Sequence, residues 1–307
     1  MLHSKDYEKY VVEDLQKSAG LTRPVKATLP ERLLIRKMNI NRLHPNPEDE
    51  FCMPDIGPNY SIVQKYQMLF MPNSKYAKKD LENAYKEPLF VEKNKPSGYM
   101  ILNGHHRWLA AHVIHKKRMP IRIVNVTQES DIIKTMSKSQ NRICASFDLD
   151  EVILVPKDAS NVEPRPKSPL SLFYKESVRE GVPALIDALR CMGCDIWVYT
   201  GQYLSEGYIQ TLLRLYQAKP DGVINGMKNR SSSGKIAERF SKRYDVSIHV
   251  DAKGIVCVDT KNKTFDTADL VKGDTMWASE AISIIRNMET VKRALSSENQ
   301  IGSEESL

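Results

Sequence analysis

Two carboxylates end an apolar stretch near the middle of the chain, where the sequence reads Cys144-Ala-Ser-Phe-Asp148-Leu-Asp150. Such a run is typical of a buried strand, and carboxylates are costly to place at its end without a function. Residues two apart in an extended segment point to the same side. Asp148 and Asp150 can therefore face one pocket as the chain leaves the strand.

A second candidate site lies in the first half, where Asn103-Gly104-His105-His106-Arg107 follows a predicted strand and opens a predicted helix. Gly104 permits close backbone approach, while Arg107 and the first helical N–H groups can face a bound phosphate. The segment therefore predicts an anion-binding site. His105 and His106 could instead bridge backbone groups at the helix start, so both interpretations stay open for them.

The segment Phe147-Asp148-Leu-Asp150-Glu-Val resembles the first motif of the haloacid-dehalogenase (HAD) superfamily of phosphohydrolases. This resemblance implies that Asp148 is the nucleophile, which becomes an aspartyl-phosphate and binds Mg²⁺. It implies that Asp150 is the general acid/base, which protonates the leaving oxygen and later activates water.

Three further stretches complete the HAD pattern in order along the chain. Thr200 ends the strand-like Ile196-Trp-Val-Tyr and by resemblance holds a phosphoryl oxygen. Lys228 and Lys235 are both candidates for the lysine that neutralises the phosphate, and Lys235 has the advantage of a predicted helix N-terminus. Asp251 follows a fourth strand-like run. The metal ligands implied by the resemblance are Asp148, Asp150 and Asp251.

The fourth motif departs from the family pattern, because many HAD proteins carry a second acid just after this aspartate and here the chain reads Asp251-Ala-Lys-Gly254. Asp259 lies across a predicted hairpin and could substitute only if that turn folds back. No cap domain is evident either. Residues 156–173 form a Pro/Ser-rich insertion, which suggests an open site.

The first half, over residues 33–126, resembles the ParB/sulfiredoxin nucleotide-binding fold. It is nearest to the ParB-related free-serine kinases, in which Gly-His-His-Arg contacts nucleotide phosphates. This resemblance implies that ATP or ADP is held by Gly104, His105, His106 and Arg107. Such kinases use an acid after the first strand as a base, and Glu50 in Pro47-Glu-Asp-Glu50 is our candidate. A solvated acidic turn explains Glu50 equally well.

Two departures narrow the expected activity. Sulfiredoxins carry a catalytic cysteine where this chain has His105, so sulfinic-acid repair is not expected. ParB partition proteins continue into a helix-turn-helix region, and here a HAD-like domain follows, so sequence-specific DNA binding is not expected. We interpret the cluster Lys116-Lys-Arg118 as an ordinary solvated helix end rather than a phosphate-steering patch.

The order of the predicted elements sets the fold class. Strands interleaved with helices in the second half predict a Rossmann-like, mostly parallel sheet with its site at the carboxyl ends of the strands. The whole is an α/β chain in which a small α+β ParB/sulfiredoxin-like domain precedes the HAD-like domain. The expected boundaries are a helical appendage over 1–30, the first domain over 31–127, a linker over 128–142, the HAD-like domain over 143–295 and a disordered tail over 296–307.

Composition agrees with two globular domains. The chain has 307 residues, is 41% hydrophobic and carries 45 Lys and Arg against 38 Asp and Glu. Residues 1–140 have a net charge of +8 and residues 141–307 a net charge of −1, so the basic excess lies in the first half. No membrane-spanning run is present and the N-terminus is too charged for a signal peptide, so we expect a cytoplasmic protein.

The sequence therefore predicts a phosphoryl-transfer protein that acts on a phosphorylated small molecule or a nucleotide. The preferred hypothesis is a Mg²⁺-dependent HAD-type phosphohydrolase with an N-terminal nucleotide-binding domain. One alternative is an ATP- or ADP-dependent kinase of a small hydroxyl compound such as free serine. Another is a nucleotide-gated binding protein whose HAD scaffold is inert.

Overall fold

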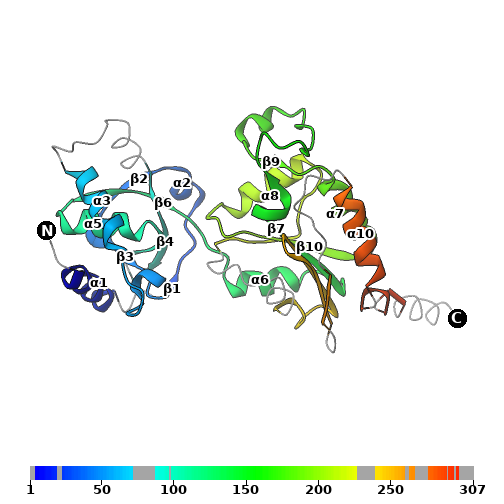
Figure 1. The fold of residues 1–307 in the computed structure, drawn as a ribbon, viewed down its shortest axis with the longest axis horizontal. Coiled ribbons are helices and arrows are strands. Elements are labelled where there is room, and N and C mark those ends of the chain that lie inside the picture. Colours follow the sequence, from blue (N-terminus) through cyan, green and yellow to red (C-terminus); the bar gives the residue numbers. More distant parts are fainter. Residues whose placement is uncertain are drawn as a thin grey trace. The chain divides into compact units, whose positions relative to one another are not determined.

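The computed structural model describes residues 4–18, 23–71, 87–96, 98–226, 239–259, 263–266, 276–288, 290–293 and 295–296. The chain divides into two compact units, unit 1 over Met1–Asn125 and unit 2 over Val126–Leu307 (Figure 1). Each unit has its own sheet and buried core, which confirms the α/β fold class. Within the described residues, no helix has the length and apolar character to cross a bilayer.

Unit 1 is built on a six-stranded sheet in the order β2-β6-β4-β5-β3, with β1 paired to β4. Its helices and 3-10 turns are α1 (Ser4–Lys17), α2 (Leu29–Leu33), η1 (Ile40–Arg42), η2 (Glu50–Cys52), α3 (Tyr60–Phe70) and α5 (His105–Val113). Its strands are β1 (Arg23–Pro24), β2 (Arg36–Asn39), β3 (Leu43–Pro45), β4 (Leu89–Lys95), β5 (Gly98–Asn103) and β6 (Arg118–Ile123). Strands β4 and β5 pair antiparallel and form a hairpin.

The N-terminal helix is part of this unit rather than an appendage. Helix α1 contacts both α5 and β3. Val11 is buried in the unit 1 core, and Oδ2 of the buried Asp14 lies 2.9 Å from Nδ1 of His44 on β3. A domain boundary near residue 30 would separate these groups.

Unit 2 has a second six-stranded sheet in the order β11-β10-β7-β12-β13-β14. Its helices and turns are α6 (Glu129–Met136), η3 (Leu149–Ile153), η4 (Pro169–Phe173), α7 (Val182–Cys191), α8 (Glu206–Leu215) and α10 (Trp277–Asn287). Its strands are β7 (Ile143–Asp148), β8 (Leu154–Val155), β9 (Ser177–Val178), β10 (Cys194–Tyr199), β11 (Gly222–Ile224), β12 (Val246–Asp251), β13 (Gly254–Asp259) and β14 (Lys263–Asp266). The first four strands of this order run parallel, as predicted.

Helices cover both faces of this sheet. Apolar residues of α7, α8 and α10 pack on one face, and residues of α6 pack on the other, so α6 and α10 lie on opposite sides of β7 and β10 (Figure 1). Ile132 and Met136 of α6 are buried against Trp197 and Tyr244. The segment 128–142, expected to be a linker, thus contributes to the unit 2 core.

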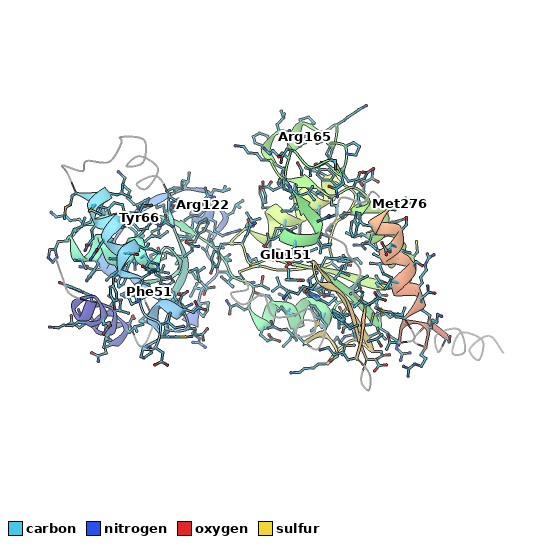
Figure 2. All side chains as sticks on the ribbon, viewed as in Figure 1. Phe51, Tyr66, Arg122, Glu151, Arg165 and Met276 are labelled. Carbon is cyan, nitrogen blue, oxygen red and sulfur yellow. The ribbon has the colours of Figure 1, made fainter. Side chains whose placement is uncertain are left out.

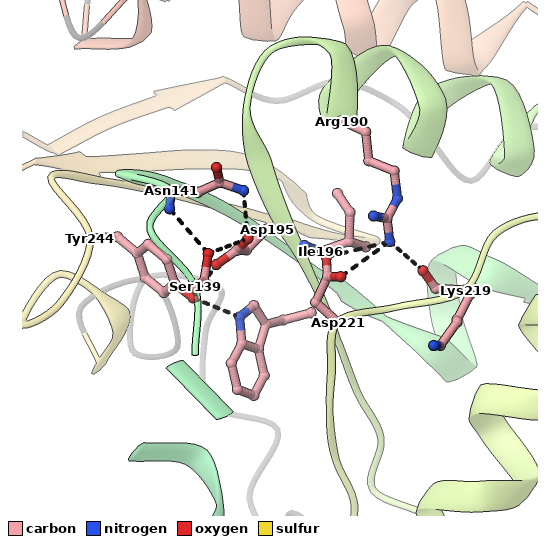
Figure 3. Close-up of polar contacts among 9 residues, drawn as sticks. Ser139, Asn141, Arg190, Asp195, Ile196, Lys219, Asp221 and Tyr244 are labelled. Carbon is pink, nitrogen blue, oxygen red and sulfur yellow. Dashed lines mark hydrogen bonds and ion pairs between the residues drawn. The ribbon is translucent and has the colours of Figure 1, made fainter. Parts of the chain in front are cut away.

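A polar cluster anchors the end of β10 that is remote from Thr200. The carboxylate of Asp195 is 5% exposed and accepts hydrogen bonds from Ser139 Oγ at 2.9 Å, Asn141 Nδ2 at 2.7 Å and Tyr244 Oη at 2.8 Å (Figure 3). Every donor comes from a segment outside β10. Asp195 therefore ties the chain entering β7 to the residues that precede β12.

Candidate functional site

The carboxyl ends of β7, β10 and β12 meet at one edge of the unit 2 sheet. Tyr199 is in register with Asp148 across the parallel pair β7 and β10, and Val250 is in register with Phe147 across β7 and β12. Asp148, Thr200 and Asp251 therefore follow or end three neighbouring strands at the same level. Parallel α/β sheets bind ligands at this edge.

Asp148 is held by the turn that follows its strand. Its Oδ1 accepts hydrogen bonds from the backbone N–H groups of Asp150 at 2.8 Å and Glu151 at 3.0 Å. Glu151 is labelled in Figure 2. The Asp148 side chain is buried, and this burial, opposed in part by the two hydrogen bonds, raises the pKa of its carboxyl to about 6. At neutral pH the group is ionised and fixed in place, as a nucleophile requires.

Asp150 is bound to the loop after β10. Its Oδ2 accepts hydrogen bonds from Thr200 Oγ1 at 2.9 Å and from the Gly201 N–H at 3.2 Å, and its Oδ1 accepts one from Gln202 Nε2 at 2.7 Å. Thr200 is fully buried, and its Oγ1 also accepts the N–H of Gln202. The structure thus joins Asp150 and Thr200 directly.

Asp251 occupies the same edge on β12 and caps its own turn. Its Oδ1 accepts the N–H groups of Lys253 at 2.7 Å and Gly254 at 3.2 Å. Asp259 is far from it, because β13 runs antiparallel and places Asp259 beside Val246 at the start of β12. At about 3.3 Å per residue that is about 16 Å away, so Asp259 does not replace the second acid that the motif lacks.

The described residues contain no group of three or more His, Cys, Asp and Glu side chains placed to hold a metal ion. Both carboxylate oxygens of Asp150 are instead used by Thr200, Gly201 and Gln202. The three-carboxylate set of Asp148, Asp150 and Asp251 is therefore not assembled here. Asp148 and Asp251 remain as a pair on adjacent strands.

Sequence reasoning did not find a buried polar chain behind Asp148. Ser146 Oγ lies 3.0 Å from His249 Nδ1, and His249 Nε2 lies 2.9 Å from Tyr199 Oη. Burial and then the charges of Asp148 and Asp251 raise the pKa of Tyr199 far above its ordinary value. Ser146, Tyr199 and His249 all face the α6 side of the sheet. Alternation along each strand allows this, but only the register between the strands shows that the three side chains meet.

The lysine candidates Lys228 and Lys235 both lie outside the described residues, within the gap between 226 and 239.

In unit 1, the two histidines of the Gly-His-His-Arg segment accept backbone hydrogen bonds. His105 Nε2 accepts the N–H of Asn46 at 3.3 Å, and His106 Nε2 accepts the N–H of Asn59 at 3.0 Å. Both rings pack on Phe51, the first stacked and the second edge-on. Burial lowers the pKa of His106, which keeps the ring neutral and able to accept. The pair therefore holds the loop over residues 46–59 in place.

Gly104 and Arg107 fit closely at the start of α5. Gly104 has φ of 101°, and a Cβ there would lie 2.5 Å from Leu89 Cδ2 and 2.9 Å from Arg107 Nη2. The Arg107 side chain is 4% exposed, and its Nη1 contacts the backbone oxygen of Glu87 at 2.9 Å and Glu87 Oε2 at 3.0 Å. Glycine is thus required for the guanidinium to lie against the helix start.

Residues 81–140 match the family model of the ParB N-terminal domain. The match includes the whole Gly104–Arg107 segment and runs beyond Asn125 into α6. It confirms the ParB resemblance for this part of the chain.

Two solved structures of the C-terminally truncated chromosome-partitioning protein ParB from Caulobacter crescentus are similar to the chain at 18% identity. The complex with CTP-gamma-S matches over 36% of this chain and 56% of ParB, with a TM-score of 0.23. The complex with the centromeric parS site matches over 34% and 47%, with a TM-score of 0.22. The chain thus spans about half the length of these ParB chains. No curated protein matches it.

Asp49, rather than the predicted Glu50, is the acid that lies near the histidines of the ParB-like domain. Asp49 caps η2 by accepting the Phe51 N–H at 3.1 Å, and its Oδ2 lies 3.7 Å from His105 Nδ1. Glu50 is exposed. The only sequence signal for Asp49 is the preference of aspartate for the residue before a short helical turn.

Proposed function

We propose that unit 2 is a phosphohydrolase that acts through an aspartyl-phosphate on Asp148. One observation carries this proposal: the ends of three adjacent parallel strands bring together Asp148, the hydrogen-bonded pair of Asp150 and Thr200, and Asp251. These residues span more than 100 positions along the chain, from Asp148 to Asp251, and their side chains match the chemistry that the motif resemblance implies.

The reaction begins with in-line attack of an Asp148 carboxylate oxygen on the phosphorus of a monoester. The bond to the leaving oxygen breaks, and Asp150 gives that oxygen a proton. Asp150 then takes a proton from water, whose oxygen attacks phosphorus and releases phosphate and the free Asp148. Thr200 would hold a phosphoryl oxygen during both steps by turning its hydroxyl from Asp150 to the phosphate.

A magnesium ion fits this donor set in one specific way. Mg²⁺ is commonly held by one or two carboxylates, with water and substrate phosphate completing its shell, rather than by a full protein cage. Asp148 and Asp251 supply two carboxylates on neighbouring strands. When bound, the ion would neutralise charge on the phosphoryl group and on Asp148.

The test is release of phosphate from a generic aryl phosphate, with and without Mg²⁺, by the full chain. We expect Asp148→Asn to abolish turnover and Asp251→Asn to weaken the response to Mg²⁺. Asp187→Asn is the matched control, because it removes one carboxylate from an exposed position on α7. Turnover that persists in Asp148→Asn at the control level would refute the role of Asp148, and absence of turnover in the unmodified chain would favour an inert scaffold.

A second function is supported by the family match, which covers Gly104–Arg107. We propose that unit 1 binds a nucleotide through this segment, with Arg107 exchanging its Glu87 partner for a phosphate. Titration with CTP, ATP and ADP tests it. Arg107→Lys keeps the charge but loses the planar fork, so it should weaken binding about tenfold, while Arg122→Lys on the exposed face of β6 should not.

The kinase alternative predicts a different product. Free serine and ATP or ADP would yield phosphoserine, and Glu50→Gln would stop its formation without changing nucleotide affinity. Nucleotide binding with neither phosphoserine formation nor phosphatase turnover would instead identify a non-catalytic nucleotide-gated protein.

A further inference from the structure

A hollow of about 390 Å³ lies in unit 1 at the C-terminal end of α5. It is lined by Asn39, Ile40, Asn41, His112, His115, Lys116, Lys117 and Arg118. Gly104 and Arg107 lie at the other end of this nine-residue helix, about 13 Å away at 1.5 Å per residue. The hollow is therefore separate from the proposed nucleotide site.

The turn after α5 places the basic residues around this hollow. His115 adopts the left-handed conformation, with φ of 55°, and its N–H donates to His112 O at 3.0 Å. The Lys116 N–H donates back to Ala111 O at 2.9 Å, which ends the helix with a left-handed cap. On the opposite wall, the N–H of Ile40 donates to Lys117 O at 3.2 Å. The walls are thus fixed by backbone hydrogen bonds.

The charged side chains that line the hollow are all basic, and the acids Glu13 and Asp14 act on His112 from outside the lining. Lys116, Lys117 and Arg118 are cations, two histidines add imidazoles, and none of the described residues that line the hollow is acidic. Cations near a helix C-terminus are common because they complement its dipole. That dipole amounts to only about half an elementary charge, which is too little to neutralise three cations.

Two groups in the wall show the energetic cost of this arrangement. Lys116 lies 4.6 Å above the ring of Phe70, and burial together with the charge of Lys37 lowers the pKa of its ammonium to about 8. His112 stacks on Trp108, and its Nδ1 is buried with no hydrogen-bond partner among the described residues. An anion in the hollow would stabilise the Lys116 charge.

We propose that this hollow binds a diphosphate group, either inorganic or carried by a nucleotide. Its volume falls in the range of small-molecule sites, about 300–1,000 Å³. Lysine and arginine side chains that line a concavity can bind several oxygens of a compact polyanion. A nucleic-acid backbone instead favours basic side chains spread along an extended surface.

Protection of lysines from acylation, read by mass spectrometry on the unmodified chain, tests the proposal. We expect inorganic pyrophosphate to slow acylation of Lys116 and Lys117 at least tenfold and to leave Lys65, an exposed lysine of α3, unchanged. ADP in place of pyrophosphate distinguishes a nucleotide ligand from an inorganic one. Protection by ADP at a tenfold lower concentration would show that the nucleoside contributes to binding. Absence of protection by both, or protection only by a DNA duplex, would overturn the proposal.

Paired variants give an independent measurement. Lys117→Gln with Arg118→Gln removes two exposed charges from the hollow and should weaken pyrophosphate binding, measured by calorimetry, at least tenfold. Lys65→Gln with Arg122→Gln removes two exposed charges elsewhere in unit 1 and should change it less than twofold. Equal effects of the two pairs would show a general charge effect and would refute a site at the end of α5.

Discussion

Replacing Asp148 by asparagine tests whether the carboxylate at the end of β7 is kept there at a cost in stability. Asp148 is 2% exposed, and burial raises the pKa of its carboxyl to about 6, against an ordinary value of 3.8. Each pKa unit corresponds to about 1.4 kcal/mol, so ionising this group costs about 3 kcal/mol more in the folded chain than in the unfolded chain. Asparagine keeps an acceptor oxygen for the Asp150 and Glu151 N–H groups and carries no charge.

The raised pKa also fixes the sign of the pH dependence. Between pH 3.8 and about pH 6, the folded chain keeps a proton on Asp148 that the unfolded chain has released. The wild-type stability therefore falls as the pH rises through this range. The disadvantage of wild type relative to Asp148→Asn is greatest above pH 6 and disappears below pH 3.8.

Thermal unfolding in buffer containing a chelator measures the difference. At neutral pH we expect Asp148→Asn to raise Tm by about 5 °C or more, since 1 kcal/mol moves Tm by about 2–4 °C for a unit of this size. The two melting temperatures should converge as the pH approaches 3.8. Asp187→Asn should change Tm little at either pH. A variant that melts at or below the wild-type temperature at neutral pH would refute the assigned burial cost.

Three further substitutions have defined outcomes. Asp195→Ala leaves three donors of a buried cluster without their acceptor and should lower the free energy of unfolding in urea by about 3 kcal/mol. Gly104→Ala puts a Cβ 2.5 Å from Leu89 at a positive φ, so it should cost about 1–3 kcal/mol in the same assay. Thr200→Val removes the hydroxyl that donates to Asp150 and should lower kcat by about 100-fold while KM changes little; an unchanged kcat would contradict the proposed role.

The main strands and helices could be predicted because their patterns are long. The apolar residues over 33–40 favour a single strand by their pattern, but the chain there forms the end of α2 followed by β2. Pro30 and the capping box between Thr28 and Glu31, whose Oε2 accepts the Thr28 N–H at 2.8 Å, start a helix there. Leu33 and Leu34 are exposed, so their apolar character did not indicate a buried strand. The short strands β8 and β9 carry too few residues for any period to show.

The candidate site was predictable only where strand ends mark it. The spacing of Asp148 and Asp150 predicts that both side chains face one pocket at the end of the strand. In the structure, Asp148 accepts a hydrogen bond from its own turn and Asp150 accepts one from Thr200. That division depends on the loop after β10, whose path no local pattern specifies. Likewise, His249 lies beside Tyr199 only because β12 and β10 both flank β7, a fact of sheet order rather than of sequence spacing.

The two candidate sites hold their charged groups in ways that suit different tasks. Arg107 is buried, but its carboxylate partner Glu87 is 60% exposed and can move into solvent. In the proposed nucleotide site, an incoming phosphate would take the place of Glu87 and keep the buried guanidinium paired, which suits reversible binding. Asp148 is held by backbone N–H groups of its own turn, which cannot leave without breaking the fold. Its position is fixed before any substrate arrives, and pre-positioning of this kind is what in-line attack on phosphorus requires.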